Sequence, residues 1–356
     1  MCYNTFMKTI KDVDVKDKTI LVRVDYNVPL KNSKVENDLR IRASLPTINY
    51  LLDHGAKKII LISHLGRPEG KITPELSLSP IANTLCKLLP HQKIGFYPLP
   101  TPGEKLKTPA DEKIVLLENL RFDPGEEQNS LDFIKNIVTA TDADIFIQDG
   151  FAVIHRAHAS TDAITTLLPS YAGLLVEKEV ENLKKILQNP DSPVLLIIGG
   201  SKVEDKQPLI DKFIKIADQI IVGGKIAADG YMSTNKKIYV AEDFDENSEG
   251  AKLDIGPLST GKIASFITDA KTIIWNGLLG YAEDPTYATA STITAELIGE
   301  KKDATTIICG GDTTGFVENL MENHPSLSYS LVSTGGGAAL EFLLGKDLPG
   351  LKAISS

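Results

Sequence analysis

The feature that most constrains the fold of this chain is a repeated alternation of short apolar segments with longer segments of helical period. In the first half, segments rich in Ile, Val and Leu predict strands at residues 19–25, 57–63, 113–119 and 144–150. In the second half, predicted strands that run into glycine lie at residues 193–200, 219–224, 272–277, 306–311 and 330–337. Because strand–helix–strand units repeat, we expect an α/β fold with parallel sheets covered on both faces.

Helix signals lie between the predicted strands. Asp38 is predicted to cap a helix that Gly55 ends, and Ser79-Pro80 is predicted to start another. Residues 235–254 are polar and acidic around a short apolar core, so we expect a surface excursion there.

The length of 356 residues is about twice that of a typical single domain, which predicts two domains. The segment 174–189 carries apolar residues at helical spacing and is followed by Pro190, so it is predicted to be a connecting helix. We therefore expect an N-terminal domain over residues 1–173 and a C-terminal domain over residues 190–345.

The charge balance argues against a polyanionic partner. The chain has 38 Lys and Arg against 47 Asp and Glu, a net charge of -9, and would repel nucleic acid over most of its surface. No apolar run approaches the ~20 residues that cross a bilayer, and the N-terminus has no hydrophobic signal core. We expect a cytoplasmic protein without a membrane partner.

The number and spacing of the cysteines argue against stabilisation by disulfides or by a structural metal ion. Cys2, Cys86 and Cys309 are far apart in the sequence and odd in number, which supports neither a disulfide framework nor a zinc site. We expect reduced and mostly buried thiols.

Polar residues follow each predicted strand of the first half, where ligands bind in open parallel sheets. In chain order they are Asp25, Asn27, His64, Arg67, Arg121, His155 and Arg156. All arginines of the chain precede residue 157, and arginine suits forked recognition of phosphate or carboxylate. Each residue alone could be a surface arginine or a capping aspartate, but four converging strand ends predict a site for a small acid carrying such groups.

Glycines follow the predicted strands of the second half. They are Gly199-Gly200, Gly223-Gly224, Gly277, Gly310-Gly311 and Gly335–Gly337. Glycine allows close approach of a ligand, and a helix N-terminus attracts phosphate, so this edge favours a nucleotide; tight turns are the alternative explanation for any one pair. Lys202 and Lys206, four residues apart, could both reach phosphate oxygens, and Asp312 could hold the magnesium ion of a nucleotide.

Two glycine patterns resemble nucleotide motifs without matching them. Residues 256–263 have the P-loop spacing, but Ile263 stands where a metal-binding Ser or Thr is needed, and no clear strand precedes. We interpret this segment as a loop entering a helix. The glycines at 335–337 lack the dinucleotide pattern and its acidic residue, which argues against a dehydrogenase.

From about Met7 to its C-terminus the chain resembles the phosphoglycerate kinase family. The resembling motifs, in the family's order, are VRVDYNVPL, DLRIR, GAKKIILISHLGRPEG, VLLENLRFDPGEE, HRAHAS, GGSKVEDK, DIGP, WNG, GGDT and STGGGAALEFLLG. The resemblance implies two Rossmann-like domains facing a cleft, joined by a hinge helix that allows closure, with the tail at about 346–356 returning to the first domain. It also implies a monomer.

The resemblance implies reversible transfer of the γ-phosphoryl of ATP to the carboxylate of 3-phospho-D-glycerate, giving 1,3-bisphosphoglycerate and ADP (EC 2.7.2.3). The residues implied to bind phosphoglycerate are Asp25, Asn27, Arg40, His64, Arg67, Arg121 and Arg156. Those implied to bind the nucleotide are Lys202, Lys206, Gly223, Gly224, Glu283, Gly311, Asp312, Thr313, Gly335, Gly336 and Gly337. Arg40, Lys202 and Gly336 are implied to be catalytic, Glu283 to bind the ribose, Gly223 and Gly224 to face the base, and Asp312 to hold Mg²⁺.

The chain departs from the family around the expected base pocket. It reads GGKIAADG where the family usually has a third glycine, the following segment to DIGP is shorter, and Leu278 replaces the proline of WNGP. Thinner walls predict weak discrimination between bases, with GTP used almost as well as ATP. A catalytically silent relative is the alternative class, but such a chain would be expected to lose some of Arg40, Lys202, Lys206 or Asp312, and all are present.

Overall fold

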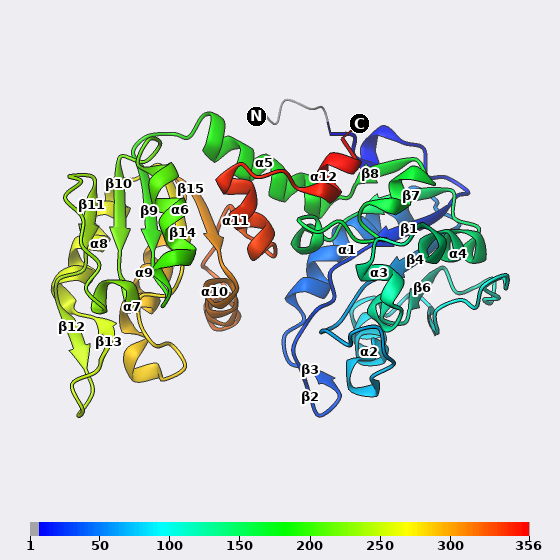
Figure 1. Ribbon diagram of the computed structural model, residues 1–356, viewed down its shortest axis with the longest axis horizontal. Coiled ribbons are helices and arrows are strands. Elements are labelled where there is room, and N and C mark those ends of the chain that lie inside the picture. Colours follow the sequence, from blue (N-terminus) through cyan, green and yellow to red (C-terminus); the bar gives the residue numbers. More distant parts are fainter. Residues whose placement is uncertain (1–6, 356) are drawn as a thin grey trace. The chain divides into compact units, whose positions relative to one another are not determined.

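A parallel sheet of six strands forms the first of two compact units (Figure 1). The computed structural model describes residues 7–355, so Cys2 lies outside the described residues. The first unit reaches to Lys178 and includes the segment from Asp347 onward, and the second is Glu179–Lys346. In the first sheet the order is β5-β6-β4-β1-β7-β8. Its strands are β1 (Thr19–Arg23), β4 (Lys58–Ile62), β5 (Ile94–Tyr97), β6 (Ile114–Leu117), β7 (Ile145–Gln148) and β8 (Ser170–Ala172).

Alternate side chains of this sheet pack into two apolar clusters. Ile20 and Ile59 belong to the cluster that includes residues of the helices α1 and α2, whereas Leu21 and Ile60 belong to the cluster that includes residues of α4. Burial on both faces explains the uninterrupted apolar sequence of the strands. The helices of the unit are α1 (Leu39–Asp53), α2 (Ser79–Leu88), α3 (Pro124–Glu127), α4 (Leu131–Thr141) and α12 (Pro349–Ala353). Its 3₁₀ turns are η1 (Ile10–Asp12), η2 (Pro74–Leu76), η3 (Leu120–Phe122), η4 (Phe151–Val153) and η5 (Ala163–Thr166), and β2 (Leu30–Lys31) pairs with β3 (Lys34–Val35).

The four predicted strands of this half are confirmed, and the two edge strands were not predicted. β5 contains Gly95 and β8 has only three residues, so neither has a strand-like apolar run. Asp38 occupies the N-cap position of α1 as predicted, but its carboxylate accepts from Arg42 Nε at 2.7 Å and makes no hydrogen bond to the backbone N–H groups of the first turn.

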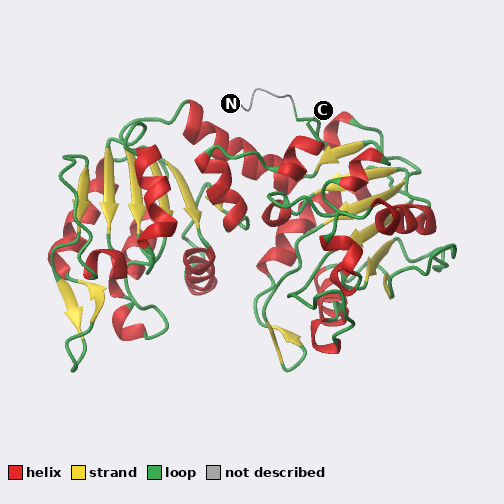
Figure 2. Ribbon diagram, viewed as in Figure 1, coloured by secondary structure: helices red, strands yellow, loops and turns green. Residues whose placement is uncertain are grey.

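The second unit has the same layered plan, with helices on both sides of a parallel sheet (Figure 2). Its order is β11-β10-β9-β14-β15-β16. The strands are β9 (Val194–Ile198), β10 (Gln219–Val222), β11 (Ile238–Val240), β14 (Thr272–Asn276), β15 (Thr305–Cys309) and β16 (Leu331–Val332). The helices are α6 (Val203–Phe213), α7 (Gly224–Ala228), α8 (Pro257–Asp269), α9 (Thr289–Glu300), α10 (Gly311–Asn323) and α11 (Gly337–Leu344), with η6 at Pro285–Tyr287.

The segment 235–254 is more ordered than a surface excursion, which corrects that expectation. Residues 238–240 form β11 at the edge of the sheet, and β12 (Phe244–Glu246) pairs antiparallel with β13 (Lys252–Ile255). β13 also directly precedes the P-loop-like segment, where no strand was expected. Gly261 and Lys262 lie inside α8, so their backbone belongs to a helix rather than to a phosphate-binding loop.

The predicted helix between the halves is α5 (Leu174–Gln188). The division between the two units falls within it, after Lys178. The C-terminal segment belongs to the first unit, where the Gly350 N–H donates to the Ile154 carbonyl at 2.9 Å.

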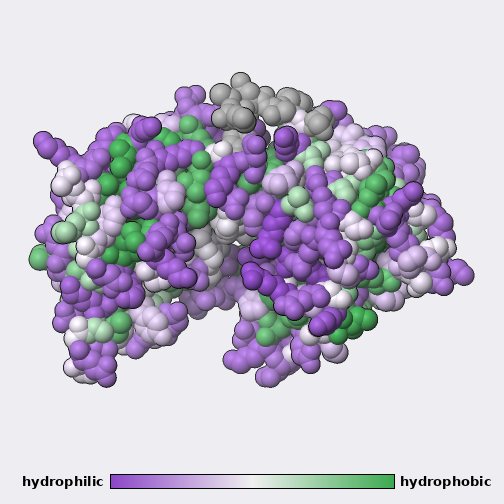
Figure 3. Space-filling view, in the orientation of Figure 1, coloured by the Kyte–Doolittle hydropathy of each residue, from purple (hydrophilic) through white to green (hydrophobic). Residues whose placement is uncertain are grey.

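On the face seen in Figure 3 hydrophilic residues predominate. Among the described residues, no helix is long and apolar enough to span a membrane. Cys309 is buried as expected, but Cys86 is exposed, because it lies on the outer side of α2, away from the buried Ile81 and Leu85.

Candidate functional site

Four strand ends of the first unit meet at one edge of its sheet. β6, β4, β1 and β7 are consecutive and parallel, and Arg23 at the end of β1 is in register with Ile62 and Gln148 of its neighbours. Asp25 and His64 therefore follow aligned strand ends. The expected convergence of these ends is confirmed by the sheet order.

Arg40, in the first turn of α1, is held by Asp25. Its Nη1 donates to Asp25 Oδ2 at 2.6 Å and to the Asn27 carbonyl at 3.3 Å. The Asp25 side chain is only 3% exposed, whereas that of Arg40 is 31% exposed. Asn27 Oδ1 accepts from the Gly66 N–H at 3.0 Å, which ties the loop after β1 to the loop after β4. The guanidinium is thus anchored on one side and open to solvent on another.

His64 is neutral and has a defined tautomer. Arg23 Nη2 lies 3.1 Å from His64 Nδ1, and because a guanidinium has only donors, Nδ1 accepts and the proton sits on Nε2. Burial, Arg23 and Arg121 together hold the pKa of His64 well below its usual value. His64 therefore offers a neutral Nε2–H donor.

The buried charge of Arg23 is balanced by the buried carboxylate of Glu126, to which Ser160 links it. Its Nε donates to Ser160 Oγ at 2.8 Å, and Ser160 Oγ in turn donates to the buried Glu126 carboxylate at 2.6 Å. Sequence reasoning missed both Arg23 and Glu126. The sequence did contain a signal for Arg23, which is a charged residue at the end of an otherwise apolar strand. A charged residue in such a position is buried only when other side chains pair with it.

The remaining arginines differ in how they are held. Arg121 Nη1 donates to the Gly66 carbonyl at 2.7 Å, and its Nε lies 3.1 Å from Glu127 Oε1. Half-buried Arg156 donates from Nε to His155 Nε2 at 3.2 Å. Arg67 is exposed and has no hydrogen bond or ion pair with the described residues. Contacts therefore link Asp25, Asn27, Arg40 and Arg121, while Arg67 and Arg156 stand in the neighbouring loops without such links.

Positive charge is concentrated at this edge. Burial, and after it Arg121, Arg23 and Arg156, lower the pKa of His158 to about 4. Guanidinium groups that disfavour a further cation would favour an anion in the same place.

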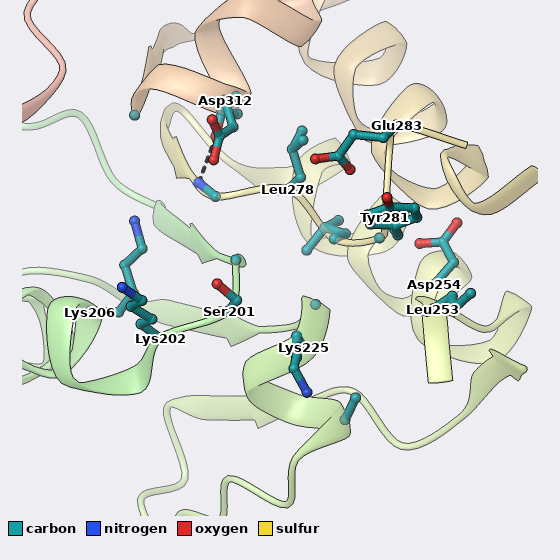
Figure 4. A pocket seen from close by; sticks show the side chains of 18 of the residues that line it. Ser201, Lys202, Lys206, Lys225, Leu253, Asp254, Leu278, Tyr281, Glu283 and Asp312 are labelled. Carbon is teal, nitrogen blue, oxygen red and sulfur yellow. Dashed lines mark hydrogen bonds between the residues drawn. The ribbon is translucent and has the colours of Figure 1, made fainter. Parts of the chain in front are cut away.

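The strand ends of the second unit surround a cavity of 590 Å³ (Figure 4). Of the residues expected to bind nucleotide, those that line it are Lys202, Lys206, Gly224, Glu283, Gly311, Asp312 and Thr313. Gly223, Gly335, Gly336 and Gly337 do not line it. Lys202 and Lys206 lie toward one end with Asp312, whereas Tyr281, Glu283 and Asp254 lie toward the other (Figure 4).

The end with the lysines has the features of an anion site. Lys202 is exposed at the N-terminus of α6, and Asp312 lies in the first turn of α10, whose N-terminal N–H groups point to the same edge. Lys206 Nζ donates to Asn276 Oδ1, and burial lowers the pKa of this lysine. Thr313 is buried and its hydroxyl accepts from the Gly277 N–H at 2.8 Å, so this side chain supports the loop after β14.

Glycines of this edge serve two purposes. A Cβ at Gly199 would lie 2.1 Å from the Leu278 carbonyl oxygen, and one at Gly277 would lie 2.2 Å from the Gly199 carbonyl oxygen. These two glycines are required by close backbone packing between the loops after β9 and β14. A Cβ at Gly311 would meet nothing within 4 Å, so that position is open toward a ligand.

The opposite end of the cavity has an apolar wall and a buried carboxylate. Phe244, Leu253 and Leu278 line it, so the shorter chain still encloses a pocket. Asp254 accepts from the N–H groups of Ile255 and Ala290 at 2.9 and 3.0 Å. Burial raises the pKa of Asp254 to about 6.

The turn at 335–337 stands at the N-terminus of α11, beside the edge strand β16. Glu179 of α5 accepts from the N–H of Thr334 at 2.7 Å and from its hydroxyl at 3.1 Å. The left-handed φ of 48° at Gly336 favours glycine there.

A family model described as phosphoglycerate kinase matches residues 10–239 and 227–346 of the chain. The chain belongs to the phosphoglycerate kinase family. A phosphoglycerate kinase of Fervidobacterium nodosum is 39% identical over 98% of both chains, and that of Moorella thermoacetica is 37% identical over 98% of both. The structure of phosphoglycerate kinase from Coxiella burnetii aligns with a TM-score of 0.78 and 32% identity over 98% of both chains. That from Pyrococcus horikoshii aligns with a TM-score of 0.83 and 26% identity over 98% of this chain and 99% of the other.

Membership in the phosphoglycerate kinase family fixes the reaction. The chain is a phosphotransferase, EC 2.7.2.3, that transfers a phosphoryl group of ATP to 3-phosphoglycerate in glycolysis. Kinases of this family use ATP with Mg²⁺. The alignment with the F. nodosum phosphoglycerate kinase extends over 399 positions although the chain has 356 residues, so the relative has residues that the chain lacks.

Proposed function

We propose that the two residue sets divide the reaction between the two units, with 3-phosphoglycerate at the arginine-lined edge of the first sheet and Mg-ATP in the cavity of the second. The observation that carries this division is that arginines and a neutral histidine occur at the first edge, whereas the second edge has lysines, helix N-termini and an apolar pocket. A compact trianion suits the former, and a nucleotide with a long phosphate chain and a base suits the latter.

In the first unit, Arg67, Arg121, Arg156 and the Nε2–H of His64 bind the 3-phosphate. Arg67 has no hydrogen bond or ion pair with other described residues, so its whole fork is free for a phosphate. Arg40, anchored by Asp25, contacts the reacting carboxylate and then the phosphoryl group in transit. Asn27 orients the acid from the opposite side.

The acceptor needs no general base, because the carboxylate of 3-phosphoglycerate is already ionised at pH 7. Catalysis then consists of positioning the two ligands and neutralising charge on the transferred group. Lys202 contacts the transferred phosphoryl group and Lys206 the phosphates of the nucleotide. Gly336, at the N-terminus of α11, contributes its backbone N–H, and Glu283 binds the ribose.

Asp312 is the residue that would hold Mg²⁺. Among residues 7–355, no three His, Cys, Asp or Glu side chains gather as a metal site. Magnesium usually needs only one or two carboxylates, since phosphates and water supply the other ligands, so a single aspartate in the phosphate-binding end fits. The bound ion would neutralise charge on the nucleotide phosphates.

We further propose that the protein acts as a monomer in the cytoplasm, with neither nucleic acid nor membrane as a partner. The excess of acidic residues supports the exclusion of nucleic acid.

A coupled assay of ADP formation tests the proposed reaction and the role of Lys202 in it. We expect ADP to form only when 3-phosphoglycerate and Mg-ATP are both present, and expect Lys202→Ala to abolish most turnover. A chain that binds both ligands without turnover would instead be the catalytically silent relative.

A further inference from the structure

Lys225 introduces a cation into the wall of the nucleotide cavity. It follows the pair Gly223-Gly224 at the start of α7, and it lines the cavity with Gly224 and Ala228. Figure 4 shows Lys225 apart from the Lys202 and Lys206 side chains. Its charge therefore lies apart from the phosphate-binding end of the cavity.

The backbone fixes where this lysine starts. Gly224 has a left-handed φ of 59°, and a Cβ there would lie 2.6 Å from the Leu278 carbonyl oxygen. The loop that carries Leu278 and the start of α7 are thus in direct backbone contact. A side chain at residue 225 begins next to this wall of the cavity, whatever its rotamer.

The Lys225 ammonium makes a solvent-exposed ion pair with Asp229. It lies 2.6 Å from Asp229 Oδ1 one helical turn away, and the two side chains are 62% and 54% exposed. Exposed pairs at this spacing contribute little, so the side chain is free to exchange this partner for one in the cavity.

Two other polar groups of the lining have partners of their own. Asp254 points its oxygens at the N–H groups of Ile255 and Ala290. The Lys252 ammonium lies 4.6 Å from the centre of the Phe244 ring, in a cation–π contact. Leu253 and Leu278 add apolar groups to the lining of the cavity.

Given the nucleotide placement proposed above, on which this inference rests, the base enters the part of the cavity that Lys225 lines. Phosphates at Lys202, Lys206 and α10, with the ribose at Glu283, leave that wall for the purine edge. Adenine presents an amino donor at C6, whereas guanine and hypoxanthine present a carbonyl acceptor. We propose that Lys225 reads the C6 substituent and raises the use of 6-oxopurine nucleotides relative to ATP.

The ratio of kcat/KM for GTP to kcat/KM for ATP, each with saturating 3-phosphoglycerate, tests this proposal. We expect Lys225→Met to lower the ratio by at least tenfold and Lys225→Arg to retain it within threefold. ITP, which has the C6 carbonyl of GTP but lacks its C2 amino group, should follow GTP in both the wild type and the variants. Lys262→Met is the matched control, because this lysine of α8 lies 4.9 Å from the Phe266 ring and does not line the cavity.

The possible outcomes separate a failure of the Lys225 proposal from a failure of the proposed function. A ratio that Lys225→Met leaves within twofold of wild type, or that Lys262→Met lowers equally, overturns the role of Lys225. Use of ITP that resembles use of ATP overturns the C6 carbonyl as the group that is read. If the wild type turns over neither nucleotide, the proposed function fails instead, and calorimetric titration of Mg-GDP and Mg-ADP into wild type and Lys225→Met gives the same comparison by affinity.

Discussion

The guanidinium of Arg40 donates from Nη1 to the buried carboxylate of Asp25 at 2.6 Å, in the first turn of a helix whose axis leads away from the sheet edge. Two residues further along the same helix, Arg42 makes a similar contact with Asp38 at 2.7 Å, with side chains 55% and 27% exposed. The first pair has a nearly inaccessible carboxylate and the second does not, so the two pairs should differ sharply in function.

Asp25→Asn should impair phosphoglycerate use, because Arg40 loses the charged partner that fixes its guanidinium. We expect kcat/KM for 3-phosphoglycerate to fall ~10- to 100-fold, about 1.4–2.7 kcal/mol, with KM for ATP nearly unchanged. Asp38→Asn is the matched control and should leave both parameters within twofold, as surface pairs of this kind contribute about 0.5 kcal/mol or less. Steady-state kinetics with each substrate varied measure both parameters. Equal effects of the two substitutions would contradict this account.

Arg156→Ala should raise the KM for 3-phosphoglycerate far more than the KM for ATP. The reason is the loss of a forked, charge-assisted contact to the 3-phosphate. The same two-substrate kinetics measure it. A weakened ATP dependence with unchanged phosphoglycerate dependence would mean that the ligand assignments of the units are reversed.

Asp312→Ala should reduce turnover without lowering the melting temperature. The Asp312 carboxylate has no hydrogen bond or ion pair with the described residues, so its loss removes no cap, which would be worth ~1 kcal/mol. A magnesium titration of activity should show a higher requirement in the variant. A lowered melting temperature together with an unchanged magnesium optimum would instead identify a capping aspartate.

Asp149→Asn should change how stability depends on pH. Asp149 is buried at the end of β7 and accepts from the Leu175 N–H at 3.0 Å, and burial raises its pKa to about 8. The folded state therefore retains a proton that the unfolded state releases near pH 4, so this group costs stability as pH rises through about 4 to 8, by up to about 1.4 kcal/mol per pH unit. In urea unfolding, the wild type should lose stability relative to the variant over that window. Parallel stability curves, or a gain by the wild type, would refute the shift.

The sequence predicted the strands that its apolar runs encode, and the residues that follow them. Asp25, His64 and Arg121 could be placed at one edge, because parallel strands align their carboxyl ends and the motifs follow those ends directly. Lys202, Lys206 and Asp312 could be placed together in the same way.

Features that depend on tertiary contacts could not be predicted from the sequence. Arg23 is buried through Ser160 and Glu126, which lie more than a hundred residues away along the chain. The strand β11 is apolar but only three residues long and half-buried, so its run is too short to predict a strand. The hairpin β12–β13 has few apolar residues, because a short ribbon buries only part of its side chains. Gly223 was expected at the base, but a Cβ there would meet the Leu279 side chain at 2.7 Å, so its small size serves packing.

The division of ligands between the units is tested most directly by calorimetric titration of 3-phosphoglycerate and of Mg-ADP into the wild type, Arg67→Ala and Lys206→Met. Arg67 has no hydrogen bond or ion pair with the described residues, and within residues 7–355 the Lys206 ammonium donates only to Asn276, so neither change should disturb the sheets. Arg67→Ala should weaken 3-phosphoglycerate at least ~10-fold, about 1.4 kcal/mol, and leave Mg-ADP unchanged, and Lys206→Met should do the converse. A weakening of both ligands by each variant, or the reversed pairing, would contradict the account.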